Sequence, residues 1–145
     1  MVMIEVPKGM GCRTIQKSER FVERIAVLIV DDNATVRDGL QSILQANDDI
    51  NVVGEAVDGA DAIAQAERLH PEVILMDAQM PGIDGIEATR RIKQRLPDAK
   101  ILFLTVHSGY IEEAMAAGAD ANLMKDTDRE TLLATIRELG GRRKR

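Results

Sequence analysis

Residues 25–40 read IAVLIVDDNATVRDGL, and this stretch decides the fold. Its first part, Ile25–Val30, is a continuous apolar run rich in β-branched residues, which is typical of a strand buried on both faces of a sheet. Asp31 and Asp32 end the run, and a helical pattern follows over Thr35–Ala46. Periodicity alone leaves a short buried helix as the alternative to the strand. A strand, a polar turn and a helix in this order predict the first half of a βαβ unit.

The same alternation continues along the rest of the chain. Apolar runs predict four further strands, at Ile50–Ala56, Val73–Met76, Lys100–Thr105 and, more weakly, Asn122–Met124. Helical patterns lie between and after them, at Ala60–Leu69, Asp84–Leu96, Tyr110–Ala117 and Asp128–Leu139. Strict β/α alternation predicts an α/β fold, a doubly wound five-stranded parallel sheet with helices on both faces. Five strands fit the flavodoxin-like order 2-1-3-4-5.

Short local motifs support these boundaries. Asp84 to Glu87 and Thr127 to Glu130 resemble capping boxes, which begin helices. His70 precedes a proline and is therefore expected to end a helix. Gly118 follows an Ala-rich helix, at a position where a left-handed residue is expected.

The composition describes one globular domain with an aliphatic core. The chain has 145 residues, of which 45% are hydrophobic and only 2% aromatic. The core must therefore be built from Val, Ile, Leu, Ala and Met, and Met115 and Met124 are expected to fill it. So few aromatic side chains argue against recognition of single-stranded nucleic acid by base stacking.

Charge divides the chain into three parts. We expect a flexible N-terminal extension over residues 1–24, one domain over 25–140, and a basic tail or the start of a linker over 141–145. Residues 25–141 hold 10 basic and 21 acidic residues, and such an acidic body is not expected to bind DNA by itself. Cys12 is the only cysteine, and the longest apolar run is far shorter than the ~20 residues that span a bilayer. These features favour a cytoplasmic protein that does not enter a membrane.

Polar residues follow four of the five predicted strands. Asp31 and Asp32 follow the first strand and Asp77 the third, while Thr105 closes the fourth and Lys125 follows the fifth. The carboxyl ends of parallel strands meet at one edge of the sheet, so these side chains are expected to lie together. Three neighbouring carboxylates repel one another, and a divalent cation such as Mg²⁺, which prefers oxygen ligands, removes that penalty.

Each of these residues also has an ordinary structural explanation. An Asp pair after a strand is most often a turn or a helix cap, and a single Lys or Thr is most often a solvated surface residue. The placement of all five at strand ends favours a common site.

The chain resembles the receiver domain of two-component response regulators. The resemblance rests on four segments over about residues 25–140: IAVLIVDDNATVRDGL, VILMDAQMPGIDGIEATRRI, ILFLTVHS and AGADANLMKD. It is similar in particular to receivers that usually precede LuxR-type DNA-binding domains.

The resemblance implies a role for each site residue. Asp77 corresponds to the phosphoacceptor, Asp32 to the direct Mg²⁺ ligand, and Asp31 to the acid that acts through water. Gln79 corresponds to the residue that lends its backbone carbonyl to Mg²⁺. Thr105 and Lys125 correspond to the switch hydroxyl and to the lysine that pairs with the phosphoryl group.

The family also implies partners. A sensor histidine kinase would donate the phosphoryl group, and the chain would be a signalling switch rather than an enzyme, although it would assist its own phosphorylation and dephosphorylation. Readout, by a homodimer or a downstream effector, would use the fourth helix, fifth strand and fifth helix. DNA would be contacted only through a separate effector domain. A stand-alone receiver and a piece of a longer regulator are both compatible with the sequence.

The sequence departs from the family at one important position. Receivers usually carry Tyr or Phe where Asn122 stands, and Asn cannot make the same apolar contact; Tyr110 is a candidate to take that place in space. This departure motivates one alternative, a degenerate receiver that binds partners constitutively. A phosphatase is a second alternative, but it would need an acid where Gln79 stands. Nucleic-acid contact through the basic tail is a third, and a solvated terminus is the favoured explanation of that tail.

Overall fold

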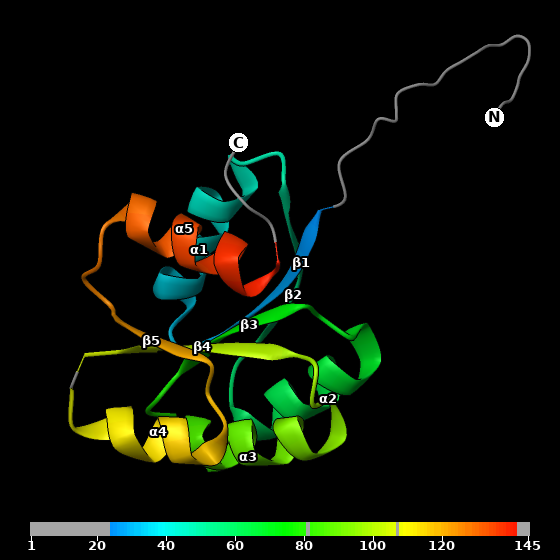
Figure 1. Cartoon of the computed structure of the whole chain (residues 1–145), viewed down its shortest axis with the longest axis vertical. Coiled ribbons are helices and arrows are strands. Elements are labelled where there is room, and N and C mark those ends of the chain that lie inside the picture. The colour runs from blue at the N-terminus through cyan, green and yellow to red at the C-terminus, as the bar shows by residue number, and fades with distance from the viewer. Residues whose placement is uncertain (1–23, 81, 107, 142–145) are drawn as a thin grey trace, which may run out of the picture.

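The centre of the protein is one parallel sheet of five strands. The computed structural model describes residues 24–80, 82–106 and 108–141. The strands are arranged in the order β2-β1-β3-β4-β5 (Figure 1). Their bounds are β1 Ile25–Val30, β2 Ile50–Ala56, β3 Val73–Asp77, β4 Lys100–Thr105 and β5 Ala121–Met124. The flavodoxin-like order is confirmed, and the predicted strand bounds are wrong only by one residue at Asp77 and at Ala121.

Helices cover both faces of this sheet, as predicted. The helices are α1 Ala34–Gln45, α2 Gly59–Leu69, α3 Gly85–Arg95, α4 Ile111–Ala117 and α5 Arg129–Leu139. In Figure 1, α1 and α5 lie on one side of the sheet and α2, α3 and α4 on the other. A short 3₁₀ helix, Ser108–Tyr110, precedes α4, so that helix begins one residue later than predicted. Among the described residues, no helix combines the length and the apolar character that a membrane crossing requires.

Two hydrophobic clusters hold these layers together. One packs α2, α3 and α4 against side chains such as Leu28, Ile74 and Phe103. The other packs α1 and α5 against side chains such as Ile29 and Leu75. Successive residues of a strand point to opposite faces, so each central strand contributes to both clusters. Every residue of β3 is buried, which fixes the strand that carries Asp77.

Three of the four residues predicted to mark helix ends are confirmed, while the helix bounds themselves differ from the predicted ones by at most one residue at each end. The Asp84 carboxylate accepts a hydrogen bond from the Glu87 amide and caps α3. His70 and Gly118 end α2 and α4 with left-handed backbones, at φ 49° and 114°. The predicted cap at Thr127 is wrong: Asp128 caps α5 by accepting from the Thr131 amide. Asp caps a helix at least as well as Thr, and this choice starts the helix one residue later.

Two methionines predicted to lie in the core are exposed instead. Met115 on α4 is 45% exposed and Met124 at the end of β5 is 37% exposed. β5 is an edge strand with a neighbour on one side only, so less of its surface is covered than that of a central strand. The aliphatic core is completed without either side chain.

The pairing of β2 with β1 shifts by one residue in mid-strand. Val27 pairs with Val52, but Leu28 pairs with Gly54, so Val53 is an extra residue in β2. β2 lies at the edge of the sheet, where bulges are common. Beyond the shift, Glu55 pairs with Ile29.

The described residues contain every element of the predicted domain. The predicted flexible extension and basic tail lie, except for Arg24 and Gly141, outside the described residues. The domain bounds at 25 and 140 therefore stay predictions.

Candidate functional site

The site lies at the carboxyl edge of the two central strands. β1 continues through α1 to β2 on one side, and β3 continues through α3 to β4 on the other. Asp31 follows β1 directly, and Asp77 is the last residue of β3. Neighbouring strands whose connections run in opposite directions leave a crevice between them, where ligands bind in open α/β sheets.

Three carboxylates meet in this crevice. Oxygen atoms of Asp31, Asp32 and Asp77 all lie within 4.8 Å of one another. Asp31 is 2% exposed and Asp77 is 7% exposed, whereas Asp32 is open to solvent. The cluster thus has two buried members and one accessible member, as a site that admits a ligand from solvent requires.

Lys125 joins the two buried carboxylates. Its Nζ lies 2.9 Å from Asp31 Oδ2 and 3.1 Å from Asp77 Oδ1. The Lys125 amide also donates a hydrogen bond of 2.8 Å to the Thr105 carbonyl, which ties the loop after β5 to the end of β4. A cavity of about 280 Å³ is lined by Val106, Met124, Lys125 and Asp126.

Burial and charge act against each other at these groups. Burial raises the pKa of Asp77, the hydrogen bond from Lys125 lowers it, and the negative charge of Asp31 raises it again; the net effect is a raised pKa. The Gln79 amide also donates to the Asp77 carboxylate and favours its ionised form. Burial lowers the pKa of Lys125, but hydrogen bonds to Asp31 and Asp77 outweigh it, so the pKa is raised. Lys125 is therefore a cation at neutral pH, held between two carboxyl groups.

The carboxylate cluster fits a hard divalent cation. Such an ion takes oxygen ligands, and Mg²⁺ binds them at about 2.1 Å, so two ligands of one ion lie about 3–4 Å apart. The oxygen separations among Asp31, Asp32 and Asp77 are close to this range. The three carboxylates are thus close enough to share one ion, and Asp32 would offer the entry from solvent.

The other two predicted site residues lie next to this cluster. Thr105 is 2% exposed at the end of β4, the strand that pairs with β3. Gln79 follows Asp77 by two residues, and its side-chain amide donates to the Tyr110 hydroxyl at 2.6 Å. Tyr110 also packs against the cluster that contains Phe103. Tyr110 was the candidate to replace the aromatic residue that the family carries where Asn122 stands. In the structure its hydroxyl accepts a hydrogen bond from Gln79.

Gly85 allows the loop after Asp77 to fold back on it. A Cβ at Gly85 would lie 2.0 Å from the Asp77 carbonyl oxygen and 3.2 Å from the Ala78 Cα. The Gly85 amide donates to the Ala78 carbonyl at 3.2 Å. The start of α3 is thus pressed against the backbone that carries Asp77.

Gly85→Ala is therefore expected to destabilise the protein. The added methyl group would meet backbone rather than a flexible side chain, so the loop must move, at a cost of about 1–3 kcal/mol. Urea unfolding of the two proteins would measure this loss. Gly39→Ala, where a Cβ would meet nothing within 4 Å, is the matched control and should not be destabilised. Equal stabilities of the Gly85 and Gly39 variants would contradict the close approach.

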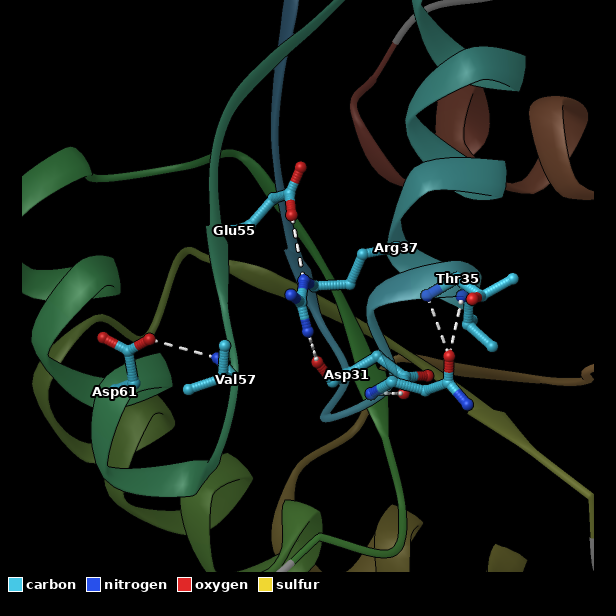
Figure 2. Close-up of polar contacts among 8 residues, drawn as sticks. Asp31, Thr35, Arg37, Glu55, Val57 and Asp61 are labelled. Atoms are coloured by element: carbon cyan, nitrogen blue, oxygen red, sulfur yellow. Dashed lines mark hydrogen bonds and ion pairs between the residues drawn. The ribbon is translucent and has the colours of Figure 1, made fainter.

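Two contacts at the site have no sequence signal. Arg37 of α1 bonds to both the Asp31 carbonyl and the Glu55 carboxylate, as the dashed lines in Figure 2 show. Its spacing from the Asp pair predicts only a surface position on a helix. The hydrogen bond between Gln79 and Tyr110 is the second, because no sequence pattern connects residues that lie 31 positions apart.

Comparison with known proteins gives several relatives of similar sequence. The chain is 44% identical over 117 residues to YxjL of Bacillus subtilis, described as an uncharacterized transcriptional regulatory protein. It is 42% identical over 116 residues to the response regulator protein VraR of Staphylococcus aureus. Both matches cover 79% of this chain but only 54% and 56% of the relatives. The chain thus spans about half the length of these relatives.

Solved structures agree with these matches. The signal receiver domain of the putative response regulator NarL from Mycobacterium tuberculosis superposes with a TM-score of 0.79 at 29% identity, over 83% of this chain and 99% of that one. The response regulator domain of Thermotoga maritima CheB gives a TM-score of 0.77 at 32% identity, over 84% and 100%. The family model described as the response regulator receiver domain matches residues 27–137. The order of the sheet, the acidic crevice and these matches agree, and the chain belongs to the receiver domain family of two-component response regulators.

Proposed function

We propose that this receiver accepts a phosphoryl group on Asp77 and acts as a Mg²⁺-dependent signalling switch. The observation that carries the proposal is the pairing of Lys125 with two buried carboxylates beside the solvent-accessible Asp32. If Lys125 only stabilised the fold by pairing with Asp31 and Asp77, a third acid, Asp32, would not be needed beside them.

The chain's own residues can be given roles in the transfer. An Asp77 oxygen attacks the phosphorus of a phosphohistidine, so that an O–P bond forms while the N–P bond breaks and its electron pair leaves with the imidazole nitrogen. Lys125, 3.1 Å from Asp77, is placed to pair with the negative charge of the transferred group. The Thr105 hydroxyl, at the end of the next strand, would donate to a phosphoryl oxygen.

The metal part of the proposal rests on the same cluster. Asp31, Asp32, Asp77 and the backbone carbonyl of Gln79 would hold Mg²⁺, with Asp31 acting through water. The ion would supply positive charge that neutralises phosphoryl oxygens during the transfer.

Incubation with acetyl phosphate and Mg²⁺, followed by intact-mass spectrometry, tests this function. We expect one phosphoryl group per chain, which is lost on treatment with hydroxylamine as an acyl phosphate should be. Excess EDTA should suppress the uptake. A chain that gains no mass under these conditions would refute the proposal.

Partners follow from the same proposal. The donor would be a sensor histidine kinase in the cytoplasm, and the signal would be read by a homodimer or a downstream effector on the α4–β5–α5 face. The exposed Met115 on α4 and Met124 on β5 support an apolar contact there. Relatives are described as transcriptional regulators, and DNA would be bound through an effector domain rather than by this acidic receiver.

Asn122 favours one alternative, a degenerate receiver that binds partners constitutively. Its Nδ2 donates to Met115 Sδ at 3.0 Å, while its buried Oδ1 has no hydrogen-bond partner among the described residues. A polar residue in this seam between β5 and α4 cannot make the large apolar contact of an aromatic side chain. The intact-mass experiment separates the alternatives, because a degenerate receiver would take up no phosphoryl group.

Asn122→Leu is expected to stabilise the protein. A buried acceptor without a partner costs about 1–3 kcal/mol, so an apolar side chain of similar size should raise the free energy of unfolding by about 1 kcal/mol. Asn47→Leu is the matched control: Asn47 donates to the Ile43 carbonyl and accepts from Arg137, so its replacement should destabilise. Urea unfolding measures both changes, and a destabilised Asn122 variant would contradict this account of the seam.

A further inference from the structure

Arg37 holds the backbone of the turn that carries Asp31 and Asp32, two of the three acids. Arg37 Nη1 donates to the Asp31 carbonyl at 2.7 Å, and its Nε donates to Glu55 Oε1 at 2.9 Å (Figure 2). We infer that Arg37 is a positioning residue for the metal site and that Glu55 holds it in place. This inference rests on the proposed function, since it assigns a second layer of support to the same site.

The Asp31 carbonyl is the effective point at which to hold this turn. It belongs to the planar peptide unit that joins Asp31 to Asp32, so a hydrogen bond to it restrains the Cα atoms of both acids. The backbone N–H of Asp31 itself donates to the Ala56 carbonyl of β2 at 3.1 Å. The backbone of Asp31 is thus fixed on both sides by β2, directly through Ala56 and indirectly through Glu55 and Arg37.

The carboxylate of Asp31 is oriented by separate contacts. Its Oδ1 accepts from the Asn33 amide at 2.9 Å, and its Oδ2 accepts from Lys125 at 2.9 Å. Asn33 in turn caps α1, the helix on which Arg37 lies. Loss of the Arg37 hydrogen bond would therefore release the peptide between Asp31 and Asp32, although the contacts of the Asp31 carboxylate remain. The two acids would then no longer be fixed relative to each other.

Arginine is suited to this role by its shape. Its guanidinium offers several donors in a rigid plane, so that Nε and Nη1 can serve two acceptors at once. The side chain is only 15% exposed and Glu55 is 31% exposed, so water competes weakly for these bonds. A lysine would keep the charge but could not hold both acceptors in the same geometry.

A second arginine provides a matched control. Arg137 of α5 makes a comparable half-buried pair with Asp49, with Nε–Oδ2 and Nη2–Oδ1 distances of 2.6 and 3.0 Å. Asp49 immediately precedes β2, so this pair lies at the amino edge of the sheet, opposite the site. Its loss should affect stability without affecting the acidic turn.

The test compares Arg37→Met with Arg137→Met in the whole chain. Mg²⁺ is titrated and followed by amide NMR shifts, and amide hydrogen exchange is measured without metal. We expect Arg37→Met to weaken Mg²⁺ binding about tenfold, the lower end for partners behind metal ligands. The Asp31 and Asn33 amides should exchange faster than in Arg137→Met, which should bind Mg²⁺ like the wild type.

Two results would overturn the inference. One is unchanged Mg²⁺ affinity in Arg37→Met, and the other is an equal loss in Arg137→Met, which would point to general destabilisation. Glu55→Gln, which keeps an oxygen acceptor, is the milder variant if Arg37→Met does not fold, and it should change both readouts in the same direction. A wild-type chain that binds no Mg²⁺ would refute the proposed function, and the exchange of the metal-free protein would then decide the role of Arg37 separately.

Discussion

Asp77→Ala should abolish phosphoryl uptake from acetyl phosphate, because it removes the oxygen that forms the new bond. The variant should still fold. Asp77 is buried and its pKa is raised, so its ionised form is costly to the folded protein, and Lys125 keeps Asp31 as a partner. Intact-mass spectrometry should therefore detect no phosphoryl group on a chain that unfolds cooperatively.

Two variants control this result. Asp77→Asn keeps the shape of the side chain but is a much weaker nucleophile, and it should also remain unlabelled. Asp48→Ala removes an exposed acid from the turn before β2, and it should be labelled like the wild type. Stoichiometric labelling of Asp77→Ala would place the acceptor elsewhere and would end the assignment.

Lys125→Met should slow phosphoryl uptake but strengthen Mg²⁺ binding. Phosphoryl uptake should slow about 10²–10³-fold, since removal of one preorganised charge or donor typically costs that much. Mg²⁺ binding should become tighter, by about tenfold at a coupling of 1–3 kcal/mol, because the amine now occupies oxygens of Asp31 and Asp77 that the ion would use. Phosphorylation kinetics and a Mg²⁺ titration measure the two effects independently.

Stability of the same variant should depend on pH. Breaking a buried pair leaves uncompensated charge, and with Lys125 24% exposed we expect a loss of about 3 kcal/mol at pH 7. The folded-state pKa of Asp77 is already raised, so this group favours the folded chain at low pH and the contribution is lost as pH rises through that pKa. Without the hydrogen bond from Lys125 the pKa should rise further.

The destabilisation of Lys125→Met should therefore shrink as the pH falls below 7. Lys100→Met, at the amino end of β4, is the control and should show no such trend. Urea unfolding at several pH values without Mg²⁺ gives the comparison. A loss of stability that is independent of pH, or a weaker affinity for Mg²⁺, would show that Lys125 does not compete for these carboxylates.

The fold was predictable from the sequence because its signals are local. Continuous apolar runs such as Ile25–Val30 mark buried parallel strands, and residues such as Asp84 and Gly118 mark helix ends. Thr127 and Asp128 show where such reasoning loses precision, since both residues can cap a helix and only the packed chain selects one. Met115 and Met124 show a second limit, because composition does not reveal which side of an edge element is covered.

The membership of the site was predictable, but its internal contacts were not. Strand ends identified Asp31, Asp77 and Lys125, because the topology of a parallel sheet gathers such ends at one edge. The bridging position of Lys125 depends on side-chain reach across the crevice. The partnership of Arg37 with Glu55 depends on how β2 meets β1, and no residue pattern in either segment fixes that.

The extra residue Val53 decides which layer of the molecule Glu55 faces. Pairing without interruption would have put Glu55 beside Val30, whose side chain belongs to the α2–α4 cluster; the shift puts it beside Ile29, whose side chain belongs to the α1–α5 cluster. A one-residue change of step exchanges the two faces of a strand. Without this shift the acid would face away from α1, and the guanidinium would have no anchor. The pairing register of β2, an edge strand two positions from the strand that carries Asp77, in this way sets where the support of the central turn is anchored.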